Sequence, residues 1–181
     1  GDDKLRYDKD AEFGGTNGVS VNLENGTATD GFGDTDTIIS FYEVQGSASN
    51  DTLIGDNSSN RLDGQDGDDS LVGQAGDDYL NGGNGNDTLD GGDGRDQLWG
   101  DAGNDVIDAS KGSASSQDYG DIVRPGLGND TIIGHQEASE LGERGEERDN
   151  GERYSGLDLL YDDLDASHAA GIVAVITDDT L

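Results

Sequence analysis

The stretch GQDGDDSLVGQAGDDYLNGGNGNDTLDGGDGRDQLWGDAGNDVID, residues 64–108, repeats a nine-residue pattern five times. Two less regular copies, GSASNDTLI and GDNSSNRLD, precede it over residues 46–63, and an eighth copy, PGLGNDTII, follows at residues 125–133. Position 8 of the nonamer is Leu or Ile in all eight copies, and position 6 is Asp in every copy but one, which has Asn60. A short motif repeated at a fixed period is the sequence signature of a solenoid.

The nine-residue period predicts strands and loops rather than a helix. Nine steps of about 100° would turn successive leucines to opposite faces of a helix, and each glycine costs about 1 kcal/mol there relative to alanine. A loop over positions 1 to 6 and a strand over positions 7 to 9 fit better, because glycines at positions 1, 2 and 4 permit tight turns and the last three positions favour pleated structure. In such a strand, position 8 points to one face and positions 7 and 9 to the other.

These repeats resemble the RTX, or haemolysin-type, family, whose nonapeptide has the consensus GGxGxDxUx with a large aliphatic residue at U. The resemblance covers residues 46–108 without a gap and then residues 125–133, and residues 82–98 match almost letter for letter. An acidic flexible linker is the alternative, but it would not keep an aliphatic residue at one phase through eight copies. The resemblance implies an all-β fold, a right-handed parallel β-roll or β-helix solenoid with calcium ions between stacked loops.

The resemblance also implies how the ions would be held. Two nonamers form one coil, so each ion lies between a loop and the loop two nonamers further along, bound by the position-6 Asp and by carbonyls of the glycine-rich turn. The well-formed pairs are the loops beginning at residues 64 and 82, 73 and 91, and 82 and 100. The predicted metal-site residues are Asp51, Gly64, Asp66, Gly67, Asp69, Gly73, Gly76, Asp78, Gly82, Gly83, Asn84, Gly85, Asp87, Gly91, Gly92, Asp93, Gly94, Asp96, Gly100, Gly103, Asp105 and Asp130.

The first two loops depart from this pattern. Ser49 and Ser58 replace the position-4 glycine in the first two copies, and Asn60 replaces Asp. We therefore expect the pairs at 46/64 and 55/73 to bind calcium weakly or not at all. We also expect Asp130 to matter less than Asp87, since its loop has no clear partner at the spacing of two nonamers.

The donor atoms in the repeats point to Ca²⁺. Asp carboxylates, Asn amides and backbone carbonyls are all oxygen donors, and Ca²⁺ takes 6–8 oxygens in flexible geometry, whereas Mg²⁺ demands a strict octahedron. Cysteine is absent, and His135 and His168 both lie outside the repeats, so zinc is not expected. The array is predicted to hold about three to five Ca²⁺ ions.

The charge balance makes folding depend on those ions. The 181 residues contain 41 acidic and 10 basic side chains, a net charge of −31, with only 30% hydrophobic residues. Residues 46–108 alone hold 15 Asp against two Arg, a local charge of 2 − 15 = −13. Such a composition is typical of disorder unless another source of folding energy exists. Metal binding and folding are therefore expected to be one event.

The flanks predict further strands and a linker. Residues 1–45 contain three strand-like segments, 5–8, 18–27 and 34–44, which resemble degenerate solenoid coils that cap the roll. Residues 109–124 are expected to bulge as a loop within the 46–134 roll, with a returning strand at 121–124. Residues 135–156 are predicted to be a charged loop or linker. Residues 157–181 echo the N-terminus at an offset of 153–154, which suggests the start of a second unit.

No catalytic constellation is found, so a non-enzymatic module is expected. The negative charge disfavours nucleic acid and anionic membranes, and no apolar run of about 18 residues could insert into a bilayer. Methionine is absent even at position 1, which suggests a piece of a larger parent chain with other domains. By resemblance, the parent is secreted or on the cell surface, exported by the type I secretion machinery. In one alternative, the parent is a large repetitive protein or adhesin, and this unit is a spacer. In the other, the parent is an extracellular protease, lipase or polysaccharide-modifying enzyme, and this unit is its folding and secretion domain.

Overall fold

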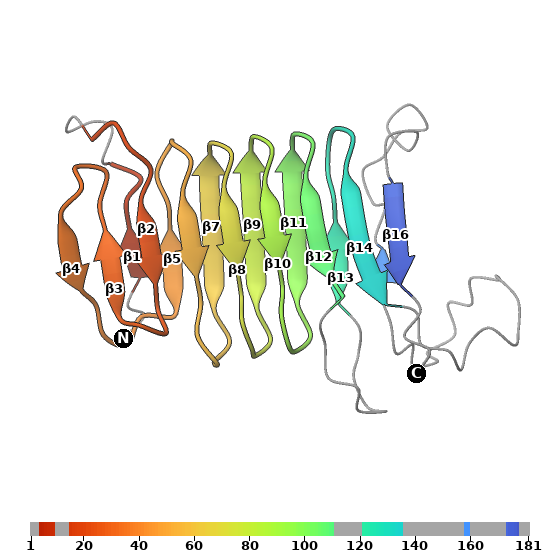
Figure 1. Ribbon diagram of the computed structural model, residues 1–181, viewed down its shortest axis with the longest axis horizontal. Coiled ribbons are helices and arrows are strands. Elements are labelled where there is room, and N and C mark those ends of the chain that lie inside the picture. The colour runs from red at the N-terminus through yellow and green to blue at the C-terminus, as the bar shows by residue number, and fades with distance from the viewer. Residues whose placement is uncertain (1–3, 10–14, 111–120, 136–157, 160–172, 178–181) are drawn as a thin grey trace, which may run out of the picture.

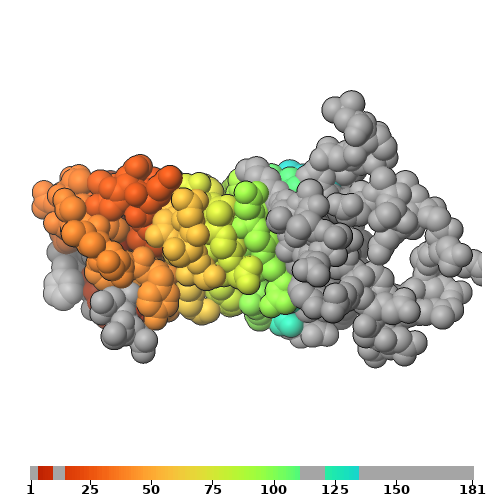
Figure 2. All heavy atoms as spheres, turned by 90° about the horizontal axis from the view of Figure 1, so that it is seen from below, coloured from red at the N-terminus to blue at the C-terminus, as the bar shows by residue number. Residues whose placement is uncertain are grey.

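The computed structural model describes residues 4–9, 15–110, 121–135, 158–159 and 173–177, which form two β-sheets along one long axis (Figure 1). The coils follow one another in chain order along that axis, giving an elongated body (Figure 2). No helix occurs among these residues, so none of them forms a helix that could cross a membrane. The expected all-β roll is confirmed.

From residue 43 onward, the strands alternate between the two sheets in chain order. The seven-stranded sheet contains, in spatial order, β1 (Lys4–Arg6), β5 (Glu43–Gln45), β7 (Arg61–Asp66), β9 (Tyr79–Asn84), β11 (Gln97–Ala102), β13 (Ile122–Arg124) and β15 (Asp158–Leu159). The nine-stranded sheet contains β16 (Val173–Thr177), β14 (Thr131–His135), β12 (Val106–Ala109), β10 (Thr88–Asp90), β8 (Ser70–Val72), β6 (Thr52–Ile54), β2 (Ser20–Asn22), β3 (Thr27–Thr29) and β4 (Thr35–Thr37).

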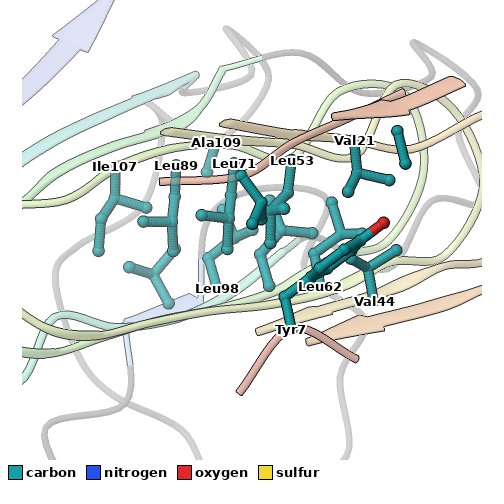
Figure 3. Packing of buried hydrophobic residues seen from close by; sticks show 14 of the residues in the cluster. Tyr7, Val21, Val44, Leu53, Leu62, Leu71, Leu89, Leu98, Ile107 and Ala109 are labelled. Carbon is teal, nitrogen blue, oxygen red and sulfur yellow. The ribbon is translucent and has the colours of Figure 1, made fainter. Parts of the chain in front are cut away.

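Each nonamer supplies one strand, and nonamers two apart pair in parallel. Leu53 is in register with Leu71, and Leu62 with Leu80, so the offset is two nonamers in both sheets. Position-8 side chains of the two sheets point toward each other and fill the core (Figure 3). All eight are fully buried, at 0% exposure: Leu53, Leu62, Leu71, Leu80, Leu89, Leu98, Ile107 and Ile132.

An insertion lengthens the offset near the C-terminal end of the array. The segment 109–124 is longer than one nonamer. Leu98 is accordingly in register with Val123, and Ile107 with Ile132, which exceeds the spacing of two nonamers. The returning strand predicted at 121–124 is confirmed as β13. Residues 111–120 of the predicted bulge lie outside the described residues.

The N-terminal flank adds coils and a hairpin. β1 and β5 extend one sheet and β2 the other, all in parallel, with Val44 and Val21 at the phase of the repeat leucines. β3 and β4 instead pair antiparallel, β3 with β2 and β4 with β3, so residues 27–37 form a hairpin rather than the degenerate coil that was predicted. All three residues of the outermost strand β4 are exposed, and its central residue is Asp36, which protects an edge strand from pairing with other chains.

Two further strands continue the roll beyond the repeats. β15 pairs in parallel with β13, and β16 with β14. Leu159 is in register with Val123, and Ala174 with Ile132, so both take the phase of position 8. The predicted charged linker, residues 135–156, lies outside the described residues except for His135, which ends β14.

Candidate metal centre

A row of buried position-6 carboxylates follows each edge of the roll, where the loops stack. The position-6 Asp precedes its strand by one residue, so the strand pairing that aligns the leucines also aligns these side chains. In each of seven stacked positions, Oδ1 accepts the backbone N–H of the position-6 residue in the preceding coil, at 2.7–2.9 Å. The accepting side chains are Asp69, Asp78, Asp87, Asp96, Asp105, Asp121 and Asp130.

The second oxygen of these carboxylates has no such contact. Oδ2 is buried without a hydrogen-bond partner among the described residues in Asp69, Asp78, Asp87, Asp105 and Asp130. Burying such an oxygen in a charged carboxylate destabilises the fold, because burial removes its water without supplying a hydrogen-bond donor. Burial accordingly raises the pKa of Asp69, Asp78 and Asp105 to about 7 and that of Asp87 to about 6, from 3.8. A cation beside each Oδ2 would remove this cost.

The glycine at position 1 closes the pocket around Oδ2. A Cβ built on Gly64 would overlap Asp69 Oδ2 and lie 2.7 Å from the carbonyl oxygen of Gly82 in the next coil. The same crowding occurs at Gly73, between Asp78 Oδ2 and the carbonyl of Gly91. Each of these positions thus brings a side-chain oxygen close to a main-chain carbonyl oxygen, and only glycine leaves room for them. The same crowding occurs at Gly46 and Gly55 in the first two loops, so the Oδ2 atoms without partners are what distinguish the later loops.

Positive φ angles at positions 2 and 4 give the loops one shared conformation. The six loops that begin at residues 64, 73, 82, 91, 100 and 125 all have positive φ at both positions. Glycine adopts this region without cost, but position 2 is Gln65, Gln74 or Asp101 in three loops, with φ of 85°, 84° and 67°. A non-glycine residue there costs about 1–2 kcal/mol, so the stacking of the coils imposes this backbone against local preference.

The structure stacks the three loop pairs predicted to be well formed, and it adds a fourth. The loop at 125 stacks on the loop at 100: Asp105 N–H donates to Asp130 Oδ1 at 2.9 Å, and Gly103 N–H donates to the Leu127 carbonyl at 2.8 Å. The Asp130 loop thus has no partner at the spacing of two nonamers, as expected, but the insertion gives it a partner at a longer spacing that the sequence did not predict.

Sequence reasoning also missed Asp121. It is buried and accepts the N–H of Asp96 at 2.8 Å, as a position-6 residue does. The signal that could have found it is the spacing Asp121-x-Val123, which repeats the Asp and aliphatic positions of the nonamer.

In the first two loops, the side-chain oxygens at position 6 accept hydrogen bonds from the protein itself. Asp51 Oδ2 accepts the N–H of Ser47 at 2.6 Å, and its Oδ1 accepts the N–H of Val19 at 2.7 Å. Asn60 Oδ1 likewise accepts the N–H of Asp56 at 2.7 Å. These loops show no positive φ, since serine replaces glycine at position 4. Both oxygens of Asp51, a predicted ligand, accept hydrogen bonds, so Asp51 differs from Asp69 and Asp78, whose Oδ2 atoms have no hydrogen-bond partner among the described residues.

The position-3 side chains lie apart from the buried row. Asp66, Asn84 and Asp93 are all exposed, and Asn84 Nδ2 donates to Asp66 Oδ1 at 2.8 Å across two stacked loops. No three Asp, Glu or His side chains converge on one point within the described residues. The pockets instead combine single carboxylates with main-chain carbonyls, an all-oxygen donor set that fits a hard cation such as Ca²⁺.

Comparison with known proteins agrees with this geometry. A family model of four copies of the RTX calcium-binding nonapeptide repeat matches residues 45–80, 54–89 and 81–113. No curated protein matches the chain. The matched residues include every loop that begins between 46 and 100, together with the strands that follow. Residues 45–113 of the chain are thus an array of RTX calcium-binding nonapeptide repeats, a structural calcium-binding family rather than a catalytic one.

Proposed function

We propose that the chain is a module that folds when Ca²⁺ fills its loops outside the cell, and that acts there as a stiff spacer in a large secreted or cell-surface protein. The observation that carries the proposal is the row of buried Oδ2 atoms without hydrogen-bond partners among the described residues. Extracellular modules bind Ca²⁺ with dissociation constants of about 10⁻⁴–10⁻³ M. Such sites are empty at cytosolic calcium levels and fill after export.

Four loop pairs supply the proposed ligands. In the 64/82 pair, Asp69 Oδ2 and the Gly82 carbonyl would hold the ion, and in the 73/91 pair, Asp78 Oδ2 and the Gly91 carbonyl. Asp87 serves the 82/100 pair. Asp105 Oδ2 serves the 100/125 pair together with the Pro125 carbonyl, which also lies beside Gly100.

The spacer role is supported by the two ends of the roll. Leu5 and Leu159 correspond to each other in the similar N-terminal and C-terminal segments. Leu5 is in register with Val44, and Leu159 is in register with Val123, so both have the phase of the core residues in the seven-stranded sheet. Val21 and Ala174 correspond in the same way and share a phase in the nine-stranded sheet. The C-terminal strands therefore continue the same two sheets, and a second unit that followed them would have β14, rather than its own hairpin, beside the strand that corresponds to β2. Further copies at this spacing in the parent gene are the expected finding, and a catalytic domain beside a single copy would favour a folding and secretion domain of an enzyme instead.

Circular dichroism during a calcium titration tests the folding claim. The metal-free chain is expected to lack the β spectrum and to gain it cooperatively near millimolar Ca²⁺, whereas equal Mg²⁺ has little effect because its octahedral geometry is stricter. Asp87→Asn keeps the size of the side chain and removes its charge, so its midpoint should move to higher calcium. A full β spectrum in excess chelator would falsify the proposal.

A further inference from the structure

The hairpin of β3 and β4 covers the edge of β2 that faces away from the repeat array (Figure 1). β2 pairs in parallel with β6 on one side and antiparallel with β3 on the other. At the opposite end of the same sheet, β16 pairs in parallel with β14. β6 follows β2 in the chain and β14 precedes β16, so these neighbours lie on opposite edges of two strands that correspond in sequence. The place that β3 fills beside β2 is therefore the place that β14 fills beside β16.

The hairpin contributes little to the core. Among residues 27–37, Ala28 alone belongs to the buried apolar cluster, and it is in register with Val21. A methyl group thus occupies the position where each repeat nonamer places leucine or isoleucine. All three residues of β4 are exposed, and Phe32, in the turn between the two strands, is 51% exposed. Beyond the pairing with β2, the N–H of Asn17 donates to the carbonyl of Gly31 at 3.3 Å.

The seven-stranded sheet has an open edge at the same end of the roll. β1 pairs with β5 on one side and has no second strand beside it among the described residues. Leu5 has the phase of the core residues, in register with Val44, but it is only partly buried, whereas Val44 is fully buried. Leu159, which corresponds to Leu5, has Val123 of β13 as its parallel partner. One more coil before β1 would bury Leu5 in the same way.

We propose that the β3–β4 hairpin is a removable cap, which strands β13 and β14 of a preceding copy of this unit displace. The proposal rests on the tandem arrangement proposed above. With the pairing found at the C-terminal end, Val123 of the preceding copy would be in register with Leu5, and Ile132 with Val21. Ile132 would take the place of Ala28, and isoleucine buries more apolar surface than alanine. The added coil would therefore stabilise both open edges more than the hairpin stabilises one.

The two arrangements exclude each other, because β3 and a preceding β14 need the same edge of β2. In a copy that has no unit before it, the hairpin ends the nine-stranded sheet with an exposed strand centred on Asp36, which disfavours pairing with other chains. In a later copy, the hairpin segment leaves β2, and both sheets run on without a break. The same segment thus gives a terminal cap or a continuous junction, depending on whether a copy precedes it.

A lengthened chain tests the displacement. Leu159 corresponds to Leu5 at an offset of 159 − 5 = 154 residues, so residues 121–154 are added directly before Gly1. The matched control carries the same addition with Val123→Asp and Ile132→Asp in the added segment only, because a charged side chain at these positions cannot enter an apolar core. Hydrogen exchange of the parent, lengthened and control chains is measured by mass spectrometry in saturating calcium.

The hairpin should exchange faster in the lengthened chain. Thr27–Thr29, and Ile38, whose N–H donates to the Gly26 carbonyl at 2.9 Å, should exchange at least about tenfold faster than in the parent chain, because the hairpin loses its pairing. Ser20–Asn22 should stay protected and Lys4–Arg6 should exchange more slowly, since both strands pair with the added segment. The control should match the parent chain. Unchanged exchange in the hairpin would overturn the proposal, and so would an equal increase in the control.

A second measurement applies if far-UV spectra show that the lengthened chain does not fold in calcium. A peptide of residues 121–135 is then added to the parent chain at about 1 mM, with the doubly substituted peptide as its control. If Thr27–Thr29 exchange no faster with the peptide than with its control, the proposal is overturned. Calcium is present throughout, so this outcome is separate from the folding claim: a β spectrum in chelator contradicts calcium-dependent folding, whereas a retained hairpin contradicts only the displacement.

Discussion

Asp87→Ala should destabilise the roll by an amount that grows with calcium. The substitution removes Oδ1, which accepts the buried N–H of Asp69 at 2.8 Å, and Oδ2, which is buried without a hydrogen-bond partner among the described residues. The unsatisfied N–H costs about 1–3 kcal/mol at any calcium concentration. One lost site with a dissociation constant of about 10⁻⁴ M costs about 1.4 kcal/mol at about 1 mM calcium and about 2.7 kcal/mol at about 10 mM.

Urea unfolding of the parent chain and the variant, at both calcium concentrations, measures these terms. The loss in free energy of unfolding should total about 4–6 kcal/mol at the higher concentration and be about 1.3 kcal/mol smaller at the lower one. Asn60→Ala is the matched control, because Asn60 has the same place in its nonamer but accepts the N–H of Asp56 within a loop that needs no metal. Its cost should not change with calcium. If Asp87→Ala costs the same at both concentrations, Asp87 does not hold an ion.

Three other substitutions or conditions test separate parts of the account. Gly85→Ala should lower the free energy of unfolding by about 3 kcal/mol or more, because Gly85 has a φ of 134° and a Cβ there overlaps the Gly67 carbonyl. Gly33→Ala, at a φ of 91° with open space around it, should lower it by only about 1 kcal/mol. Thermal unfolding measures both losses, and equal losses would contradict the stacking of the loops. Asp130→Ala should destabilise the calcium-bound chain by about 1–3 kcal/mol, because it leaves the N–H of Asp105 unsatisfied, and no loss in urea unfolding would refute the lengthened offset. The raised pKa values of about 6–7 mean that the charged carboxyls penalise the metal-free fold fully above pH 7, and that protonation relieves this penalty as pH falls toward 4. In calcium-free buffer, β content should therefore rise from pH 8 to pH 4.5, calcium affinity should fall over the same range, and a loss of β content on acidification would contradict the assignment.

The repeat could be predicted from sequence because its period determines both the core and the loops. Leucine at every ninth residue fixes which side chains enter the core, and the stacking of alternate nonamers follows once two nonamers form a coil. The longer offset across the insertion could not be predicted, since the extra residues in 109–124 carry no signal of how they are accommodated. The spacing Asp121-x-Val123 repeats that of the nonamer, and the pairing of Val123 with Leu98 shows that Asp121 joins the row of position-6 residues.

Two features of the site depend on contacts that sequence reasoning could not see. Asp51 occupies position 6 like the other aspartates, yet Val19, far from it in the sequence, donates to its Oδ1, and Ser47 donates to its Oδ2. Gln65 and Gln74 have no preference for positive φ, and they adopt it because the neighbouring coils hold the loop in that form. The antiparallel hairpin of β3 and β4 was missed for a related reason: its strands resemble those of the coils, and only their pairing distinguishes them.

Anomalous scattering from crystals grown in calcium would test the central claim most directly. The account predicts anomalous peaks between the stacked loops, each beside an Oδ2 atom, at Asp69, Asp78, Asp87 and Asp105, and no peak beside Asp51 or Asn60. Density for ions at the exposed position-3 side chains, with the buried Oδ2 atoms empty in a folded roll, would contradict it.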